Sequence, residues 1–345
     1  MRETIELIKK LSDIPGVSGC EGAVREEISA LIKDHCQTVE ADTLGNLLAF
    51  KKGARPGRRI MVSAHMDEVG LIITHIEEDG LLLCSPVGGI DTRVAFGRAV
   101  EIGPQRLPGV IGGKALHHLD GKERETPPGW EVLRIDIGAV GREEAQAVVA
   151  PGQRVVFSSQ FVELGEEYIL GRAFDDRAGC ALLIQLIRAE LPWDCHFVFT
   201  VQEETGCTGA ATAAYAMNPE VGIAVEATTA ADIPGTPPGE QICRLGGGPV
   251  LSYMDKGTVY DKELYDLALG LARERGIACQ SKAGVSGGNE SRAVQSAGAG
   301  ARVMAVNLPC RYLHSPSLML HKGDIAEAHK LLLALIETLG QQAGF

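Results

Sequence analysis

The sequence predicts an α/β protein whose mainly parallel central sheet is flanked by helices, with a small β-rich domain inserted into it. Two observations support this fold class. Apolar runs rich in Val and Ile alternate with segments of helical periodicity, which is typical of a parallel sheet covered on both faces. Within residues 68–161 that alternation stops, and short strands broken by Gly and Pro replace it.

The elements of the α/β part follow one another in a regular order. Two helices open the chain, and the second follows the turn Pro15-Gly16-Val17-Ser18-Gly19. A buried strand comes next, and strands and helices then alternate to the end of the chain. Helices are predicted at 3–11, 21–33, 176–189, 209–217, 262–275 and 324–339, and strands at 59–64, 196–201, 221–225 and 301–307.

The segment 68–161 is predicted to be a separate domain rather than a long irregular loop, because structureless loops of that length are uncommon in compact proteins. Its helical periodicity is confined to 142–149. The sequence therefore predicts two domains: a catalytic domain made of residues 1–67 and 162–345, and a β-rich domain inserted at 68–161. Short strands are predicted in it at 70–76, 80–84, 99–102, 109–112 and 155–156.

Composition narrows the function classes. The chain has 345 residues, of which 45% are hydrophobic and 23% charged, as expected for a soluble globular protein. Its formal net charge of −12 argues against a nucleic-acid or anionic-membrane surface, since both require clustered Lys and Arg. This balance favours small molecules or peptides as partners.

Two further features predict a cytoplasmic location. No apolar stretch approaches the roughly 20 residues needed to cross a bilayer. The nine cysteines are an odd number, contain no C-x-x-C pair and lie in apolar segments, so they are interpreted as buried thiols of a reducing compartment.

Glu203 and Glu204 are the most informative residues. They lie side by side at the end of the apolar run 196–201 and precede a turn of small residues. Two adjacent carboxylates beside a buried strand repel each other and resist desolvation, so the pair indicates a strong positive charge nearby, most simply a metal ion.

Other metal-ligand candidates follow predicted strands or begin helices. His65 and Asp67 leave the strand 59–64 at alternate positions, so their side chains can face one site. Asp175 and Asp176 precede an apolar helix, where one carboxylate suffices to cap the free N–H groups. The second is then available to a metal and can bridge two ions through its two oxygens.

Glu226 and His314 complete the set. Glu226 follows the predicted strand 221–225, and His314 lies a few residues beyond the strand 301–307. The carboxyl edge of an open α/β sheet is where ligands bind, so these residues are expected to converge there.

Charge supports a dinuclear site. The three carboxylates of Asp175, Glu204 and Glu226, with two neutral histidines, would balance two divalent ions and one hydroxide, and such pairs stand about 3.5–4 Å apart in hydrolases. Glu203 would then be free to act as a general base.

These residues carry a resemblance to a known family. The segments resemble those of the tetrahedral (TET-like) aminopeptidases, which include glutamyl and deblocking aminopeptidases and were formerly labelled endoglucanases. The match runs in order along nearly the whole chain. It comprises His65-Met66-Asp67-Glu68-Val69-Gly70, Phe174-Asp175-Asp176-Arg177, Gln202-Glu203-Glu204, Glu226 and Arg311-Tyr312-Leu313-His314-Ser315-Pro316.

The resemblance implies a role for each residue. His65, Asp175 and Glu226 would hold one metal ion, and Asp175, Glu204 and His314 the other. Glu203 would be the general base, and Asp67 would orient His65. The ions would be zinc, with cobalt or manganese as alternatives, and the substrates would be peptides cleaved at their N-terminal residue.

The resemblance also implies assembly. Pro86-Val87-Gly88-Gly89, Gly112-Gly113-Lys114 and Asp136-Ile137-Gly138-Ala139 resemble parts of the family's dimerisation domain, so the chain is expected to form dimers that build a dodecamer.

Some questions stay open at this stage. Many relatives carry Asp where this chain has Glu226, and Gly288-Asn289-Glu290 replaces a frequent Gly-Thr-Asp, which leaves the preferred N-terminal residue undetermined. The roles of His117 and His118 are also open. The alternatives are a related dinuclear carboxypeptidase or amidohydrolase, a metal-free glycosidase, and a binding module without turnover.

Overall fold

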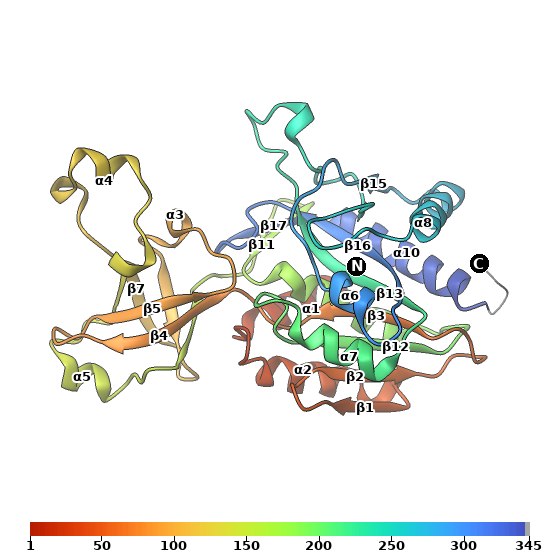
Figure 1. Cartoon of the computed structure of the whole chain (residues 1–345), viewed down its shortest axis with the longest axis horizontal. Helices are drawn as coiled ribbons and strands as arrows, with labels where there is room; N and C mark the ends of the chain where they lie inside the picture. The colour runs from red at the N-terminus through yellow and green to blue at the C-terminus, as the bar shows by residue number, and fades with distance from the viewer. Residues whose placement is uncertain (342–345) are drawn as a thin grey trace.

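The centre of the molecule is an eight-stranded sheet, seen in the computed structural model, which describes residues 1–341 (Figure 1). The four strands in its middle pair in parallel, and antiparallel pairs occur toward both edges, so the sheet is mainly parallel as predicted. In spatial order the strands are β1 (Thr38–Ala41), β2 (Leu47–Lys51), β12 (Cys195–Thr200), β3 (Ile60–His65), β13 (Val221–Thr229), β16 (Arg302–Cys310), β14 (Val250–Leu251) and β15 (Gln280–Ser281).

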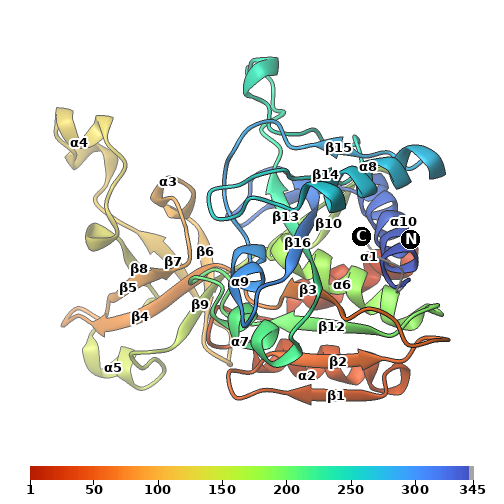
Figure 2. The same cartoon turned by 45° about the vertical axis from the view of Figure 1, so that its right-hand side comes forward.

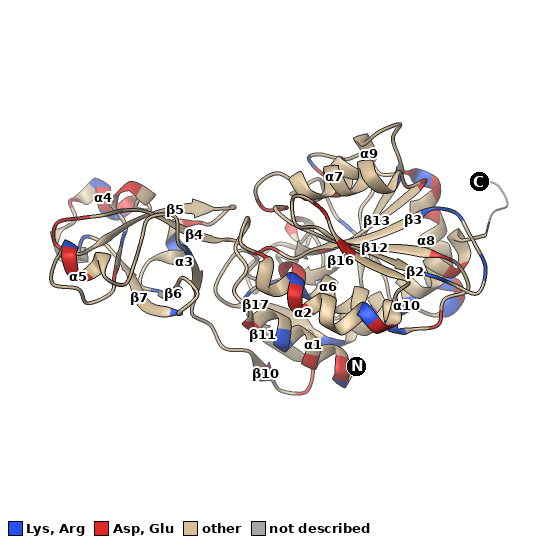
Figure 3. Cartoon of the chain, turned by 90° about the horizontal axis from the view of Figure 1, so that it is seen from below, with Lys and Arg blue, Asp and Glu red and all other residues tan. Residues whose placement is uncertain are grey.

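Helices cover both faces of this sheet, as the alternation in the sequence predicts. Figure 3 shows helices on both sides of the strands. The first face is packed by α7 (Thr208–Met217) and α9 (Ser291–Ser296). The second face is packed by α1 (Arg2–Asp13), α2 (Gly22–Ile32), α6 (Phe174–Arg188), α8 (Lys262–Arg275) and α10 (Lys322–Leu339).

Successive residues of β3 show why the strand sequence is continuously apolar. Met61 belongs to the core beneath α7 and α9, and Val62 belongs to the core on the opposite face. Because neighbouring side chains point to opposite faces, a strand covered on both sides needs apolar residues at every position.

The β-rich segment closes into a barrel of six strands with a hydrophobic core of its own. Figures 1 and 2 both show it at one end of the molecule, beside the α/β layers. Around the barrel the strands are β4 (Gly70–Ile76), β5 (Leu82–Val87), β8 (Arg134–Asp136), β7 (Leu107–Gly112), β6 (Ala99–Ile102) and β9 (Arg154–Phe157). Its helices are α3 (Thr92–Ala95), α4 (Gly121–Glu125) and α5 (Arg142–Gln146).

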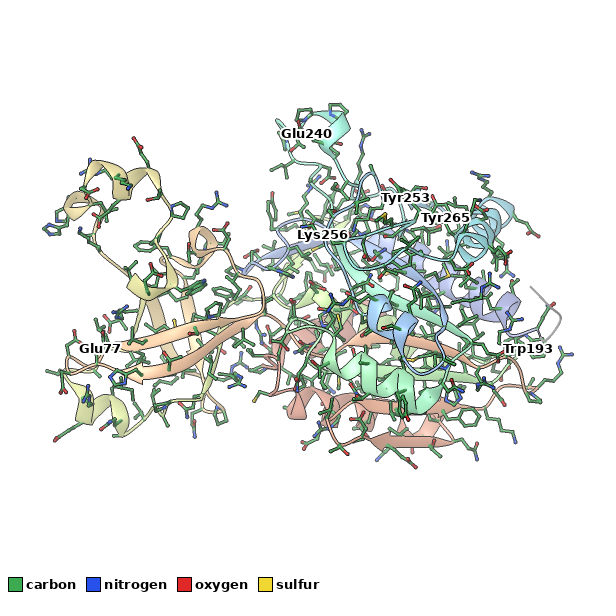
Figure 4. All side chains as sticks on the ribbon, viewed as in Figure 1. Glu77, Trp193, Glu240, Tyr253, Lys256 and Tyr265 are labelled. Carbon is green, nitrogen blue, oxygen red and sulfur yellow. The ribbon has the colours of Figure 1, made fainter. Side chains whose placement is uncertain are left out.

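A third, small sheet links the barrel to the last helix. It consists of β10 (Val162–Leu164), β11 (Tyr168–Gly171) and β17 (Leu318–His321). The segment after β13 projects outward and carries Glu240 near its tip (Figure 4). Short 3₁₀ helices occupy Lys33–His35, Leu116–His118, Trp130–Val132 and Pro238–Glu240. In the described part of the chain, none of the helices has the length and apolar character that crossing a membrane requires.

Candidate metal centre

Six of the side chains predicted to carry the chemistry line one cavity of about 410 Å³. The cavity lies at the carboxyl ends of β3 and β12, on the edge of the sheet where ligands were expected. The six residues are His65, Asp175, Glu203, Glu204, Glu226 and His314.

The six residues reach the cavity from several elements of the α/β part. His65 is the last residue of β3, Asp175 is the second residue of α6, and Glu203 and Glu204 follow β12. The prediction that Glu226 follows its strand was wrong. Glu226 lies inside β13, because that strand continues to Thr229 by pairing with β16 along its whole length.

Asp175 lies between the two histidines and uses a different oxygen toward each. His65 Nε2 is 3.2 Å from Asp175 Oδ1, and His314 Nε2 is 3.4 Å from Asp175 Oδ2. Glu226 Oε2 lies 3.6 Å from His65 Nε2, and Glu204 Oε2 lies 3.4 Å from His314 Nε2. Two groups of three ligands therefore share Asp175.

Asp176 is also near these ligands. Among the described residues, ligand atoms of His65, Asp175 and Glu204 lie within 4.8 Å of one another, and so do those of His65, Asp176 and Glu226. Asp176 Oδ1, however, accepts a hydrogen bond from the Gly179 N–H, three residues along α6, where the regular helix begins after the non-helical residues Asp175 and Asp176. Burial, and then the charge of Glu226, raise the pKa of Asp176 well above its ordinary value. This geometry favours the helix-capping role for Asp176 over a metal-ligand role.

Asp67 holds the backbone of the glutamate pair. Its carboxylate accepts hydrogen bonds from the N–H groups of Glu203 (3.0 Å) and Glu204 (3.1 Å), and from the Ser18 hydroxyl (2.6 Å). His65 Nδ1 lies 3.0 Å from the Asp67 carbonyl oxygen and 3.5 Å from its carboxylate. Asp67 therefore contacts both His65 and the backbone that positions the two glutamates.

The carboxylates and histidines perturb one another strongly. Burial raises the pKa of Glu203 to about 7 and that of Glu204 to about 8. Burial alone would also raise the pKa of Asp175, but hydrogen bonds from His314 and His65 lower it. Burial opposes the charged form of His314, yet Asp175 and Glu204 raise its pKa to about 9. The cluster thus concentrates negative charge and attracts cations.

Two buried carboxylate oxygens fit a metal ion. Oε1 of Glu204 and Oε1 of Glu226 are buried, and among the described residues neither accepts a hydrogen bond. An unpaired buried carboxylate oxygen is costly unless a cation compensates it. Two imidazoles and three carboxylates form the mixed nitrogen and oxygen set that borderline divalent ions such as zinc accept. The residues present therefore fit the predicted dinuclear centre.

The backbone around the cavity adopts uncommon conformations. Ala173, Gln202, Cys207, Tyr312 and His314 all have φ between 56° and 61°, in the left-handed region that non-glycine residues rarely adopt. Each flanks or belongs to a segment that carries a ligand. Strained residues of this kind cluster at functional sites, where the surrounding structure holds them in place.

Sequence reasoning missed other residues of the cavity. Asp255, Lys282 and Asn289 also line it. Glu290, completely buried, accepts a hydrogen bond from the Thr200 hydroxyl at the end of β12. For Asn289 and Glu290 the sequence did offer an indication, because Gly288-Asn289-Glu290 differs from the Gly-Thr-Asp that is frequent in the family. His117 and His118 are not among the residues that line the cavity.

Comparisons with known proteins agree with this site. The family of M42 glutamyl aminopeptidases matches residues 45–331. A putative aminopeptidase of Acetivibrio thermocellus is 36% identical, over 97% of this chain and 98% of that protein. The lysyl aminopeptidase of Pyrococcus furiosus is 32% identical, over 97% of each chain.

A solved structure extends the similarity to the fold. The Pyrococcus horikoshii TET1 peptidase, described as able to assemble into a tetrahedron or a large octahedral shell, is 35% identical to this chain. It superposes with a TM-score of 0.84, over 96% of this chain and 99% of its own. The resemblance found in the sequence is therefore confirmed, and the chain is a peptide hydrolase that belongs to the M42 glutamyl aminopeptidase family.

Proposed function

We propose that this aminopeptidase removes N-terminal residues from peptides with a dinuclear metal centre in which Asp175 bridges the two ions. His65 and Glu226 would complete one ligand group, and Glu204 and His314 the other. The observation that carries this assignment is that the two oxygens of Asp175 face different histidines. Two bound zinc ions, or cobalt or manganese in their place, would act as Lewis acids on the scissile carbonyl and on water.

Glu203 is the proposed general base. Among the described residues, its carboxylate is not one of those within 4.0 Å of a His65 or His314 ring nitrogen, and its Oε1 accepts a weak contact from the Cys207 thiol at 3.4 Å. A pKa of about 7 allows this carboxylate to take a proton from the attacking water and return it to the leaving amine near neutral pH. Asp67 would orient His65 and fix the Glu203 backbone, so that the base stays in place.

The domain division is part of the proposal. Residues 1–67 and 162–345 would form the catalytic domain, and 68–161 a dimerisation domain. The separate core of the barrel supports this division. Dimers would assemble further into a dodecamer, as the similarity to the TET1 peptidase suggests. The nine cysteines, none of them in a disulfide, support a cytoplasmic location.

A related dinuclear carboxypeptidase or amidohydrolase is the alternative. Such an enzyme would share the metal ligands but would recognise a carboxylate or a blocked amine. Comparing free aminoacyl substrates with their N-acetylated forms distinguishes the two, since an aminopeptidase requires the free α-amine.

Two variants test the assigned roles. We expect Glu203→Gln to keep both metal equivalents but to lower kcat by roughly 10²-fold or more, because it removes the base and leaves the ligands. His314→Ala should lose one of the two equivalents. Elemental analysis of protein reloaded with zinc, together with initial rates on an aminoacyl chromogenic substrate, measures both. Undiminished turnover in Glu203→Gln, or two retained equivalents in His314→Ala, would contradict the assignment.

A further inference from the structure

The turn that carries Glu203 and Glu204 is held through four consecutive backbone N–H groups. It begins at Val201, where the pairing of β12 with its neighbouring strands has ended. Each of these N–H groups donates to a side-chain oxygen from the N-terminal part of the chain. The acceptors are Asn46 for Val201 (3.0 Å), Glu21 for Gln202 (3.1 Å), and Asp67 for Glu203 (3.0 Å) and Glu204 (3.1 Å). Side chains, rather than a strand partner, therefore position the backbone of the proposed base.

Glu21 lies behind this turn rather than in the cavity. It directly precedes α2, is 5% exposed, and is not one of the described residues that line the cavity. Its Oε1 accepts two hydrogen bonds, from the Gly19 N–H at 2.7 Å and from the Gln202 N–H at 3.1 Å. A hydrogen bond to a buried acceptor is electrostatically stronger than one in water. Glu21 therefore ties the start of α2 firmly to the turn after β12.

Gln202 needs such a restraint because its backbone is strained. Its φ is 57°, in the left-handed region that a residue with a side chain rarely adopts. A conformation of this kind persists only where neighbouring contacts enforce it. Gln202 directly precedes Glu203, so a relaxation of its φ would change the direction in which the Glu203 side chain leaves the backbone.

We propose that Glu21 is a positioning residue for the aminopeptidase reaction: by holding the Gln202 N–H, it fixes the backbone from which Glu203 projects into the cavity. This inference rests on the proposed function, because it takes Glu203 as the general base. Asp67 holds the other half of the turn, but it also contacts His65, so its loss would disturb a metal ligand as well. Replacing Glu21 therefore addresses the placement of the base more directly than replacing Asp67.

The first test separates turnover from substrate binding. On zinc-loaded enzyme with an aminoacyl chromogenic substrate, we expect Glu21→Ala to lower kcat by roughly 10- to 100-fold, because a misplaced base loses most of its effect. KM should change by less than about twofold, since Glu21 lies outside the cavity, and elemental analysis should find both zinc equivalents retained. Glu26→Ala is the matched control, because Glu26 is exposed on the same helix and does not line the cavity, so kcat should stay unchanged.

Two conservative variants separate the hydrogen bond from the charge. Glu21→Gln keeps a carbonyl oxygen at the same reach and should retain at least about half of the wild-type kcat. Glu21→Asp keeps the charge but is one methylene shorter, so it should lose kcat as Glu21→Ala does. This pair of variants decides the question even if Glu21→Ala does not fold, and equal kcat in the two would overturn the positioning role.

Hydrogen exchange followed by mass spectrometry gives a measurement that requires no turnover. The Gln202 amide should exchange faster in Glu21→Ala and Glu21→Asp than in the wild type, and Glu21→Gln should restore its protection, because the hydrogen bond itself is what slows exchange. Unchanged protection of this amide in Glu21→Asp would contradict the proposal.

A double variant tests whether Glu21 acts through Glu203. In the Glu203→Gln background, Glu21→Ala should lower kcat by less than about a further twofold, because the base that it positions is already absent. A general structural role would instead lower kcat as much in this background as in the wild type, and that result would overturn the inference.

Failure of this inference can be separated from failure of the proposed function. If Glu203→Gln loses turnover while a folded Glu21→Ala variant keeps the wild-type kcat, Glu21 has no positioning role and the proposed function stands. If Glu203→Gln keeps full turnover, Glu203 is not the base, and this inference falls together with that assignment.

Discussion

Arg177 shows how single buried residues hold the metal-ligand loop. Its guanidinium is fully buried and donates hydrogen bonds to the carbonyl oxygens of Met66 (2.7 Å), Leu11 (2.6 Å) and Ile14 (3.0 Å). Glu68 lies 3.6 Å from Arg177 Nη2 and also pairs with Arg172. The buried guanidinium of Arg177 therefore fixes the backbone of Met66, between His65 and Asp67, by a hydrogen bond.

We expect Arg177→Met to lower the free energy of unfolding by about 3–5 kcal/mol, because it leaves three buried carbonyl oxygens without their donor and removes one of the two guanidinium groups beside the buried carboxylate of Glu68. Chemical denaturation of the two proteins measures the difference. Arg2→Met is the control: Arg2 makes an exposed pair with Glu6, and such pairs contribute about 0–1 kcal/mol. A loss below about 1 kcal/mol in Arg177→Met would contradict the anchoring role.

Some residues of the cavity could be predicted from the sequence, and others could not. His65, Asp175, Glu203 and Glu204 could be found because charged residues beside buried apolar strands and helices are conspicuous. Lys282 could not, since β15 has only two residues and shows no periodicity. Its place in the cavity depends on pairing with β14, a contact that no local pattern reveals.

At the scale of elements, the periodicity of apolar residues predicted the long, regular helices and strands. The six helices predicted in the α/β part and the four central strands are all present, with ends shifted by a few residues. The short α9 and the sheet of β10, β11 and β17 were not predicted, because elements of three to six residues barely complete one period. The extension of β13 beyond Val225 was missed because its partner β16 lies far along the chain.

Asp261 joins two of the predicted elements and makes their contact depend on pH. As the N-cap of α8 it accepts a hydrogen bond from the Leu264 N–H, and it forms a bidentate pair with Arg302 at the start of β16. The hydrogen bonds from Arg302 lower the pKa of Asp261 below its ordinary value. The pair therefore stabilises the fold above the unfolded-state pKa near 4, and this contribution is lost as pH falls through the folded-state pKa.

We expect Asp261→Asn to cost roughly 1 kcal/mol at pH 7, because Asn keeps the cap but loses the charge pair. The difference from wild type should shrink as the pH is lowered below about 4, where the wild-type carboxylate also becomes neutral. Denaturation curves recorded from pH 7 down to pH 3 measure it. Asp266→Asn, which removes an exposed pair with Lys262, should change stability at pH 7 by less than about 0.5 kcal/mol. A deficit of Asp261→Asn that stays constant with pH would exclude the charge pair as its cause.

At the scale of the whole molecule, the barrel lies at one end, beside the α/β layers (Figures 1 and 2), and it carries large exposed apolar residues. Phe96 and Val132 are 45% and 50% exposed and border a groove of about 490 Å³ near α4, which Leu119 and Pro127 also line. Large exposed apolar residues gathered in one groove indicate an interaction surface. Such a surface on the proposed dimerisation domain is best suited to a second copy of this chain.

Assembly can therefore be tested on the full chain. Twelve copies of a 36.6 kDa chain would give about 440 kDa, and we expect light scattering coupled to size exclusion to find that mass for the wild type. Val132→Glu should reduce the mass of the assembly. In a two-fold contact each copy would bring the same negative charge into an apolar interface. Val148→Glu is the matched control, since Val148 is 52% exposed and comes two residues after α5, and α5 lies at the end of the barrel opposite α4 (Figure 1). A wild-type mass of 36.6 kDa would contradict the assembly itself. A loss of mass in Val148→Glu but not in Val132→Glu would move the contact to the other end of the barrel.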